Sequence, residues 1–252
     1  MNRAVADRPF DPVWYDELSR QEDGHFWFRT RAKLIVRALR AACPDMRSFA
    51  EFGCGTGHVL SAVHHAFPGA ELTGTEFFEE GLAATRRRLP SARLMRMDLE
   101  REGLVQPVDA VGAFDVLEHV ADDSAAVCSM AASLRQGGVA VVTVPQHPQL
   151  WSWQDECSMH HRRYRRTELR GLLEFAGFEV EREISFVSLL LPLMFASRRC
   201  RIGEVPDPMA EFRMPAVLNL ALRGVMTVED ALRRCGVRYP VGGSLLAVAR
   251  RR

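Results

Sequence analysis

The stretch EFGCGTG, residues 51–57, places glycines at positions 53, 55 and 57, directly after the short hydrophobic run SFA. Glycine carries no Cβ atom, so a loop of this kind lets a ligand approach the backbone closely. A dinucleotide-binding loop needs the spacing G-x-G-x-x-G, but position 58 is His58. A P-loop needs Gly-Lys followed by Ser or Thr, which this stretch lacks. The loop therefore predicts a nucleotide site of another kind.

Strand-like and helix-like patterns alternate along the chain on both sides of this loop. Strands are expected at residues 49–52, 70–75, 93–97, 108–114 and 139–144, and helices at 31–42, 59–67, 79–89 and 125–134, the last of them stopped by Gly137 and Gly138. This alternation predicts a parallel sheet with helices on both faces, because parallel neighbours need crossover connections. Ligands of such folds bind beyond the carboxyl ends of the strands. Residues 53–57, 76, 98 and 114–119 are therefore expected to converge on one crevice.

The pattern loosens after Pro145. A helix is expected from an N-cap at Thr167 to Phe175, then a strand at 178–184, mainly helical residues at 186–235 and a last strand at 245–249. We therefore expect a single domain, 1–252, with N-terminal lid helices at 1–45, a ligand-binding core at 46–181 and 240–252, and a helical cap inserted at 182–239.

The composition is that of an ordinary globular chain, with 47% apolar and 26% charged residues and a formal net charge of +1. A charge near zero gives no general attraction to nucleic acid or to an anionic membrane. Six cysteines without a CxxC pair, and no signal peptide, favour a cytoplasmic location. The most apolar stretch, 184–196, is well short of the ~20 residues that span a bilayer, so no integral membrane association is expected.

Four further motifs follow the glycine loop in a familiar order: Glu76, MDLE at 97–100, DVLEHV at 115–120 and LRQGGVAVVTVP at 134–145. Together with EFGCGTG they resemble the ordered motifs of the class I S-adenosylmethionine (SAM)-dependent methyltransferases, over about residues 45–145. The resemblance implies an α/β fold, Rossmann-like and doubly wound, with a mostly parallel seven-stranded sheet and helices on both faces. It also implies SAM as the cofactor and S-adenosylhomocysteine (SAH) as its product.

The resemblance assigns cofactor contacts to particular residues. The glycines supply backbone approach, Glu76 matches the acid that binds the ribose hydroxyls, and Asp98 matches the acid that reaches the adenine amino group. Both acids could instead serve as helix N-caps, because each follows a strand and precedes a turn. The full predicted set is Glu51, Gly53, Cys54, Gly55, Gly57, Glu76, Phe77, Asp98, Leu99 and Asp115, with Trp27 and Arg31 added from the N-terminal lid.

The two ends of the chain are similar to a narrower bacterial branch of this superfamily that serves varied small-molecule pathways. The pattern E-x-x-H-F-W-F-x-x-R spans residues 22–31, H-x-R-R-Y spans 160–164, and P-x-G-x-S spans 240–244. The N-terminal pattern is interpreted as a lid over the cofactor, although a helix packed on the sheet edge would explain it equally well.

Methyl transfer needs an aligned acceptor, and a general base helps when the acceptor atom is a hydroxyl oxygen. The predicted catalytic residues are His160, His119 and Tyr164. The alternative for the 160–164 segment is that its arginines anchor the loop and its histidines are bystanders.

Asp115, Glu118 and His119 are expected to share one face of a short helix. Such residues can bind a divalent ion, and the spacing resembles the E-x-x-E-H metal site of some O-methyltransferases, with His147 or His160 needed to close it. Many metal-free methyltransferases carry LEH at this position, and we expect no metal site here.

The resemblance implies a methyltransferase that acts on a small-molecule acceptor, more at oxygen than at nitrogen. The apolar residues 186–195 indicate that this acceptor is partly hydrophobic, although the same residues would also serve as plain core. The alternatives are an RNA or protein methyltransferase and a non-catalytic SAM-binding regulatory subunit. No nucleic-acid partner is expected, and the chain is expected to be a monomer or a homodimer.

Overall fold

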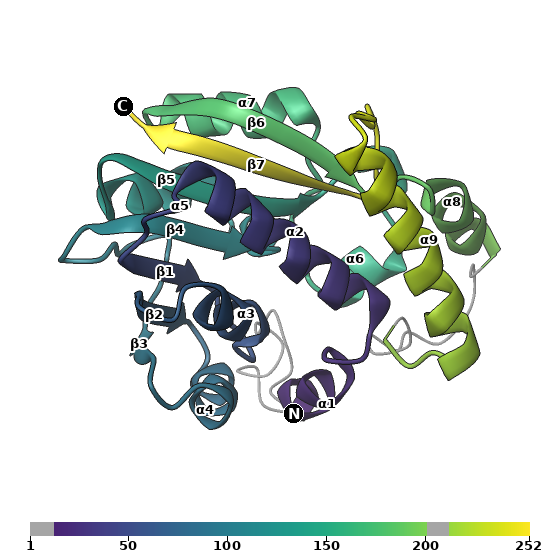
Figure 1. Cartoon of the computed structure of the whole chain (residues 1–252), viewed down its shortest axis with the longest axis horizontal. Coiled ribbons are helices and arrows are strands. Elements are labelled where there is room, and N and C mark those ends of the chain that lie inside the picture. The colour runs from purple at the N-terminus through teal and green to yellow at the C-terminus, as the bar shows by residue number, and fades with distance from the viewer. Residues whose placement is uncertain (1–12, 201–211) are drawn as a thin grey trace.

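The computed structural model describes residues 13–200 and 212–252. Within these residues seven strands form one sheet in the order β3-β2-β1-β4-β5-β7-β6 (Figure 1). The strands are β1 (Ser48–Phe52), β2 (Glu71–Glu76), β3 (Arg93–Arg96), β4 (Val108–Phe114), β5 (Leu134–Pro145), β6 (Phe178–Phe186) and β7 (Ser244–Arg251). The helices are α1 (Val13–Gln21), α2 (Phe26–Ala42), α3 (His58–Ala66), α4 (Glu79–Arg88), α5 (Asp123–Ala132), α6 (Trp153–Cys157), α7 (Arg166–Phe175), α8 (Leu191–Cys200) and α9 (Ala216–Arg234), with 3-10 turns η2 (Leu117–His119) and η3 (Pro148–Leu150).

Strands β1 to β5 pair in parallel, and β7 runs antiparallel between β5 and β6. This confirms the predicted α/β class with a mostly parallel, seven-stranded sheet. The four central parallel strands all end at the same edge, so the segments that follow β1, β2, β4 and β5 meet there. That edge is where the crevice was expected.

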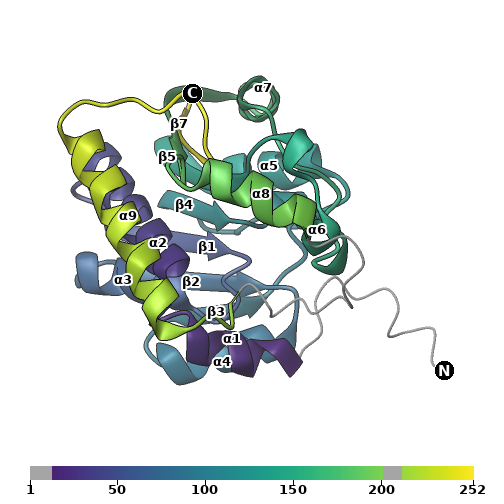
Figure 2. The same cartoon turned by 90° about the vertical axis from the view of Figure 1, so that its right-hand side faces the viewer.

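Both faces of the sheet are covered by helices, as Figure 2 shows for α2, α3 and α9 on one side and α5 and α7 on the other. The side chains of β5 alternate between the two layers. Val139 and Val141 pack with the α2–α3 layer, and Ala140 and Val142 pack with the α5–α7 layer. A strand buried on both faces reads as a continuous apolar run, which is why these strands were visible in the sequence.

The two outer segments, predicted as lid and cap, pack on each other. Helix α9 lies along α2 in both views (Figures 1 and 2). The Asn219 side chain in α9 accepts the N–H of Phe26 at 2.8 Å and donates to the carbonyl of Gly24 at 2.9 Å. Residues 1–12 of the predicted lid and 201–211 of the predicted cap lie outside the described residues.

Several predicted boundaries were wrong. Helix α5 ends at Ala132, and residues 134–138 belong to β5, where the pairing jumps from Val108–Leu134 to Ala110–Val139. Gly137 and Gly138 therefore lie in this irregular part of the strand pairing and do not end a helix. The predicted cap boundary at 182 falls inside β6, which continues to Phe186 because β7 pairs with it along that length.

Two helix starts also differ from the prediction. Helix α2 begins at Phe26, five residues before the predicted start, because the His25 ring accepts the N–H of Trp27 at 3.3 Å and caps it. Helix α7 begins at Arg166, and Arg165 occupies the cap position predicted for Thr167, with its N–H bound by the Glu168 carboxylate at 2.8 Å. Among the described residues, no helix combines the length and the apolar character that a bilayer crossing requires.

Candidate active site

The glycine loop that follows β1 adopts a backbone that only glycine accepts easily. Gly53, Gly55 and Gly57 have φ angles of 65°, 54° and 75°, in the left-handed region that is costly for other residues. The loop is also crowded: a Cβ atom on Gly53 would lie 2.5 Å from a methyl group of Val116, and one on Gly57 would lie 2.8 Å from the methyl group of Thr85. Conformation and space together account for the glycines at 53 and 57.

Glu76 lies at the end of β2, as expected, and its carboxylate is engaged by the backbone. It accepts the N–H groups of Phe77 at 2.8 Å, Phe78 at 3.1 Å and Gly55 at 3.0 Å. Burial raises the pKa of this carboxyl, and the three N–H donors oppose that shift. Glu76 therefore joins the glycine loop to the start of α4, which is the cap-like role that the sequence left open.

The other predicted contacts near β2 and β3 differ in exposure. Phe77 is 46% exposed, with the Arg96 guanidinium 5.7 Å from its ring centre. Asp98 is partly buried, and one carboxylate oxygen accepts the N–H of Glu100 at 3.1 Å. Leu99 is buried in the apolar core. Only the first two of these three side chains offer surface to a ligand.

Arg31 from α2 reaches the segment that follows β4. Its guanidinium stacks on the Trp27 ring at 4.4 Å and forms an ion pair with Asp115. Asp115 has a φ of 58° and also accepts the Thr143 hydroxyl at 3.2 Å. Asp115 therefore precedes the 3-10 turn η2, and the predicted helix face shared by Asp115, Glu118 and His119 does not exist, because the turn begins only at Leu117.

The buried polar atoms without a hydrogen-bond partner near the glycine loop include Nε2 of His58, which directly follows the loop, and two atoms of charged side chains. The latter two are Oε2 of Glu51, at the end of β1, and Nε of Arg31. Burial raises the pKa of the Glu51 carboxyl well above its usual value, and the Arg31 charge opposes this. Cys54, in contrast, is satisfied: its buried Sγ lies 3.6 Å from the Thr85 hydroxyl, and burial raises its pKa, so the thiol is inert.

The junction of α1 and α2 is fastened to the glycine loop through Glu22. The Glu22 carboxylate accepts the Thr56 hydroxyl at 2.6 Å and pairs with Arg88 at 2.6 Å. Asp23 bonds the His58 ring at 3.1 Å and Arg88 at 2.7 Å. Burial raises the pKa of Glu22 to about 7, against the opposing effects of Thr56 and Arg88. The N-terminal helices therefore contact the loop itself.

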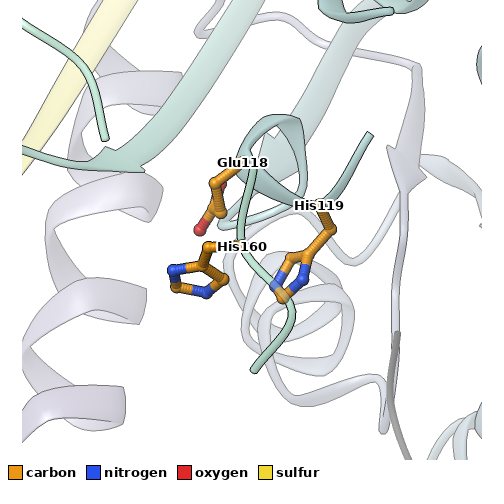
Figure 3. Close-up of side chains that lie close together, drawn as sticks. All are labelled: Glu118, His119 and His160. Atoms are coloured by element: carbon orange, nitrogen blue, oxygen red, sulfur yellow. The ribbon is translucent and has the colours of Figure 1, made fainter. Parts of the chain in front are cut away.

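On the other side of the crevice, Glu118, His119 and His160 come together from two distant segments (Figure 3). The rings of His119 and His160 meet edge to face with their centres 4.6 Å apart. Burial, followed by the nearby His160, lowers the pKa of His119 to about 3, so this ring is neutral. Burial and the Asp115 charge raise the pKa of Glu118 well above its usual value.

His160 is oriented by Asp155, which the sequence analysis missed. The buried Asp155 carboxylate binds Nδ1 of His160 at 3.0 Å and Nε of Arg163 at 2.6 Å. Burial alone would raise the pKa of Asp155, but the His160 hydrogen bond and the Arg163 charge outweigh it and lower the pKa to about 2. A signal was available in the sequence: Ser152 and Asp155 form a capping box at the start of α6.

The H-x-R-R-Y segment anchors this loop. Arg162 pairs with Asp123 at 2.6 Å, and the Tyr164 hydroxyl lies 2.8 Å from the same aspartate and 3.1 Å from the carbonyl of Leu117. Tyr164 is buried in the apolar core, and burial raises its pKa. Its position therefore favours an anchoring role over the predicted catalytic one. For Arg162 and Arg163 the anchoring alternative matches the observed contacts.

The family model described as a methyltransferase domain matches residues 19–183 of this chain. A Mycolicibacterium smegmatis protein named "Probable S-adenosylmethionine-dependent methyltransferase" is 32% identical over 165 residues, which cover 62% of this chain and 61% of that protein. A trans-aconitate 2-methyltransferase from Azoarcus sp. is 30% identical over 121 residues, which cover 47% of each protein. These alignments span less than two thirds of either relative.

A structural comparison agrees with the sequence comparisons. The SAM-bound structure of an amino pentose methyltransferase from Micromonospora echinaspora covers 96% of this chain and 98% of its own, with a TM-score of 0.58 at 19% identity. At that identity the likeness supports the fold alone. Because the family model covers well over half of its residues, the chain belongs to the methyltransferase-domain family, within the class I SAM-dependent methyltransferases.

Proposed function

We propose that this chain transfers the methyl group of SAM to a small-molecule acceptor, at oxygen in preference to nitrogen. The observation that carries this proposal is the glycine loop, whose left-handed backbone at the carboxyl end of β1 offers polar backbone groups to a ligand without phosphate. SAM has no phosphate, so it needs no cationic cradle at this loop.

The methionine end of SAM fits the unpartnered buried atoms of Glu51 and Arg31. Its ammonium group would bind the free Glu51 oxygen, and its carboxylate would bind the Arg31 guanidinium, since charge-assisted pairs of this kind are the strong ones in a buried site. The Trp27 ring stacks on the Arg31 guanidinium and keeps it in place. Asp115 would stay as the partner that holds Arg31 at this position.

The adenosine end would lie over Phe77 and Asp98. Phe77 offers an exposed ring for stacking on the base. The Asp98 carboxylate accepts the N–H of Glu100 through Oδ1 and lies 3.3 Å from Nε of the exposed Arg101 through Oδ2, and its remaining lone pairs could accept the adenine amino group. A carboxylate has about four lone-pair positions, and backbone N–H groups take three of those on Glu76. About one position remains for a ribose hydroxyl, so binding both ribose hydroxyls would require one of these hydrogen bonds to be shared.

His119 and His160 are the proposed catalytic residues on the acceptor side. In the transfer the acceptor oxygen bonds to the methyl carbon, the carbon–sulfur bond breaks, and sulfur keeps the electron pair as SAH forms. The acceptor hydroxyl must also lose its proton, and an acceptor bound at this wall would have the two imidazoles beside it. Exposed apolar side chains at Trp151, Met159 and Phe195 support a partly hydrophobic acceptor.

Calorimetry with SAH tests the proposal at its first step. We expect one SAH per chain, and no binding would refute the SAM-dependent function. Incubation with labelled SAM and fractionated cell extract then separates the alternatives: label in small molecules is expected, and label in RNA or protein would favour those acceptors. SAH binding without turnover on any fraction would favour the regulatory subunit. The net charge of +1 argues against RNA.

A further inference from the structure

Glu118, His119 and His160 each offer one ligand atom, and these atoms lie within 4.8 Å of one another (Figure 3). Three protein ligands of this kind, a carboxylate and two imidazoles, are typical of catalytic metal sites that keep one position open. In a tetrahedral zinc site the ligand atoms lie about 3.4 Å apart. Side-chain rotations that move each ligand atom by about 1 Å would bring the three atoms to the spacing of a zinc site.

The backbone holds this group together. The N–H of His161 donates to the carbonyl of Glu118 at 2.7 Å, and the Tyr164 hydroxyl reaches the carbonyl of Leu117. The loop that carries His160 is therefore fastened to the turn that carries Glu118 and His119. The proximity of the three side chains follows from these contacts, although 41 residues separate the two histidines in the sequence.

Each side chain has an atom left over for a ligand. Glu118 is 1% exposed, and its Oε2 has no hydrogen-bond partner. His160 uses Nδ1 to bind Asp155, which leaves Nε2. His119 has a ring hydrogen bond to the backbone of Ser158, which leaves its second nitrogen. A histidine held by a carboxylate or a carbonyl on one nitrogen is the usual arrangement around a metal.

We propose that Glu118, His119 and His160 bind a divalent transition-metal ion, such as Zn²⁺, Mn²⁺ or Co²⁺. Asp115 is not a ligand, because Arg31 and Thr143 occupy its carboxylate. The sequence analysis weighed Asp115, Glu118 and His119 with His147 or His160 and expected no metal, whereas the structure brings together Glu118, His119 and His160 without Asp115. Two imidazoles and one carboxylate suit these ions better than Mg²⁺ or Ca²⁺, which prefer oxygen.

The role of the ion rests on the proposed function. With the ion bound, His119 and His160 would act as its ligands in place of their role as bases. An acceptor hydroxyl in the open position would bind the ion through oxygen, and its proton would pass to solvent more easily because the ion lowers the pKa of a bound hydroxyl. The resulting oxygen would attack the methyl carbon of SAM. Metal binding itself needs neither SAM nor an acceptor, so it can be tested separately.

The test titrates the full chain, stripped with a chelator, with ZnCl₂, MnCl₂ and CoCl₂ by calorimetry, and follows the visible absorption of the Co²⁺ form. We expect one ion per chain and a Co²⁺ spectrum of a nitrogen–oxygen site. Glu118→Gln and His160→Asn should each weaken binding by at least about tenfold, and Asp155→Asn by about tenfold, through the loss of His160 orientation. His161→Asn, beside the site, is the matched control and should bind as the parent does.

SAH binding, measured on the same samples, shows that each variant is folded and keeps the two proposals apart. No ion binding at about 1 mM of any of the three ions would overturn the metal site, and so would binding that Glu118→Gln and His160→Asn leave unchanged. If SAH binds and the ions do not, only the metal site fails. If the ions bind and SAH does not, the metal site stands and the proposed methyltransferase function fails.

Discussion

The two walls of the crevice are built in different ways. The cofactor wall consists of short turns at the ends of β1 and β2, where Glu76 binds N–H groups that lie one, two and 21 residues away from it. The acceptor wall consists of the long segment after β5, held by ion pairs and hydrogen bonds to Asp123, Leu117 and Glu118, all about 40 residues away. A wall built from local turns can be recognised in the sequence as a short motif. A wall held by long-range contacts appears in the sequence only as charged residues far from one another.

The largest effect is expected at the ion pair inside the acceptor wall. Arg163→Gln would leave the Asp155 carboxylate buried without its positive partner, and we expect a loss of about 3 kcal/mol in the free energy of unfolding. Denaturant unfolding of the variant and the parent measures this loss of stability. Arg165→Gln is the control, since Arg165 pairs with Glu168 at the surface and should cost under about 0.5 kcal/mol. Equal losses for the two variants would show that the buried Arg163–Asp155 pair holds the acceptor wall no more strongly than a surface pair does.

Substitution in the glycine loop should lower the affinity for SAH. Gly57→Ala combines a left-handed φ with a Cβ atom 2.8 Å from Thr85, and we expect SAH affinity to fall by about 100-fold, or about 2.7 kcal/mol. Gly137→Ala separates the two causes, because Gly137 has a φ of 72° and no atom within 4 Å of its Cβ position. That control should lose about 1 kcal/mol of stability and no SAH affinity. Unchanged SAH binding in Gly57→Ala would contradict the cofactor assignment.

Glu22 connects the N-terminal helices to the cofactor wall, and its raised pKa predicts that the free energy of unfolding depends on pH. Its pKa in the folded chain is about 7, above the ordinary value of 4.5, so the unfolded chain loses this proton first as pH rises. Stability should therefore fall as pH rises, by on the order of 2 kcal/mol between about pH 5.5 and about pH 7. Compared with Glu22→Gln, the parent should show this extra decline in chemical unfolding followed at several pH values.

Two groups serve as references for that measurement. Glu79→Gln, at an exposed position of α4, should keep the parental pH dependence. The pKa of His58 is lowered to about 4, chiefly by burial, which reduces stability as pH falls. His58 is present in all variants, so its contribution cancels in the difference. A parallel decline in the parent and in Glu22→Gln would show that Glu22 is not the group responsible.

The smallest expected effect concerns the exposed ring of Phe77. Phe77→Ala should weaken SAH binding by about tenfold through lost stacking, and change stability by less than about 0.5 kcal/mol because the ring is half exposed. Phe175→Ala, which removes a 74% exposed ring from α7, should leave SAH binding unchanged. Equal SAH affinity in both variants would place the adenine elsewhere.

The sequence predicted the sheet well because its central strands are buried on both faces. The run at 108–114 matches β4 at both ends, and the glycine loop and Glu76 lie where they were expected. Residues 134–138 and the start of α7 were misassigned, because sheet pairing and the Arg165–Glu168 contact override the local signals of glycine and threonine.

The acceptor wall could be predicted only in part. His160 and His119 were found as candidates, but their contact depends on a loop whose path is set by Arg162, Arg163 and Tyr164. Asp155 was missed because the Ser152–Asp155 capping box marks only the start of a helix and does not indicate the partners His160 and Arg163. The role of Tyr164 as an anchor likewise depends on burial, which the motif alone does not indicate.

The position of β7 has a consequence for the order in which the chain can mature during synthesis. Strand β6 pairs with β7 and, among the described residues, with no other strand. The ribosome finishes β6 at Phe186 but reaches β7 only at Ser244. For that interval β5 keeps an open edge and β6 has no partner, while the glycine loop and strands β1 to β5 can already assemble. The cofactor wall can therefore form on the nascent chain, and the sheet beneath the acceptor wall must wait for residues 244–251.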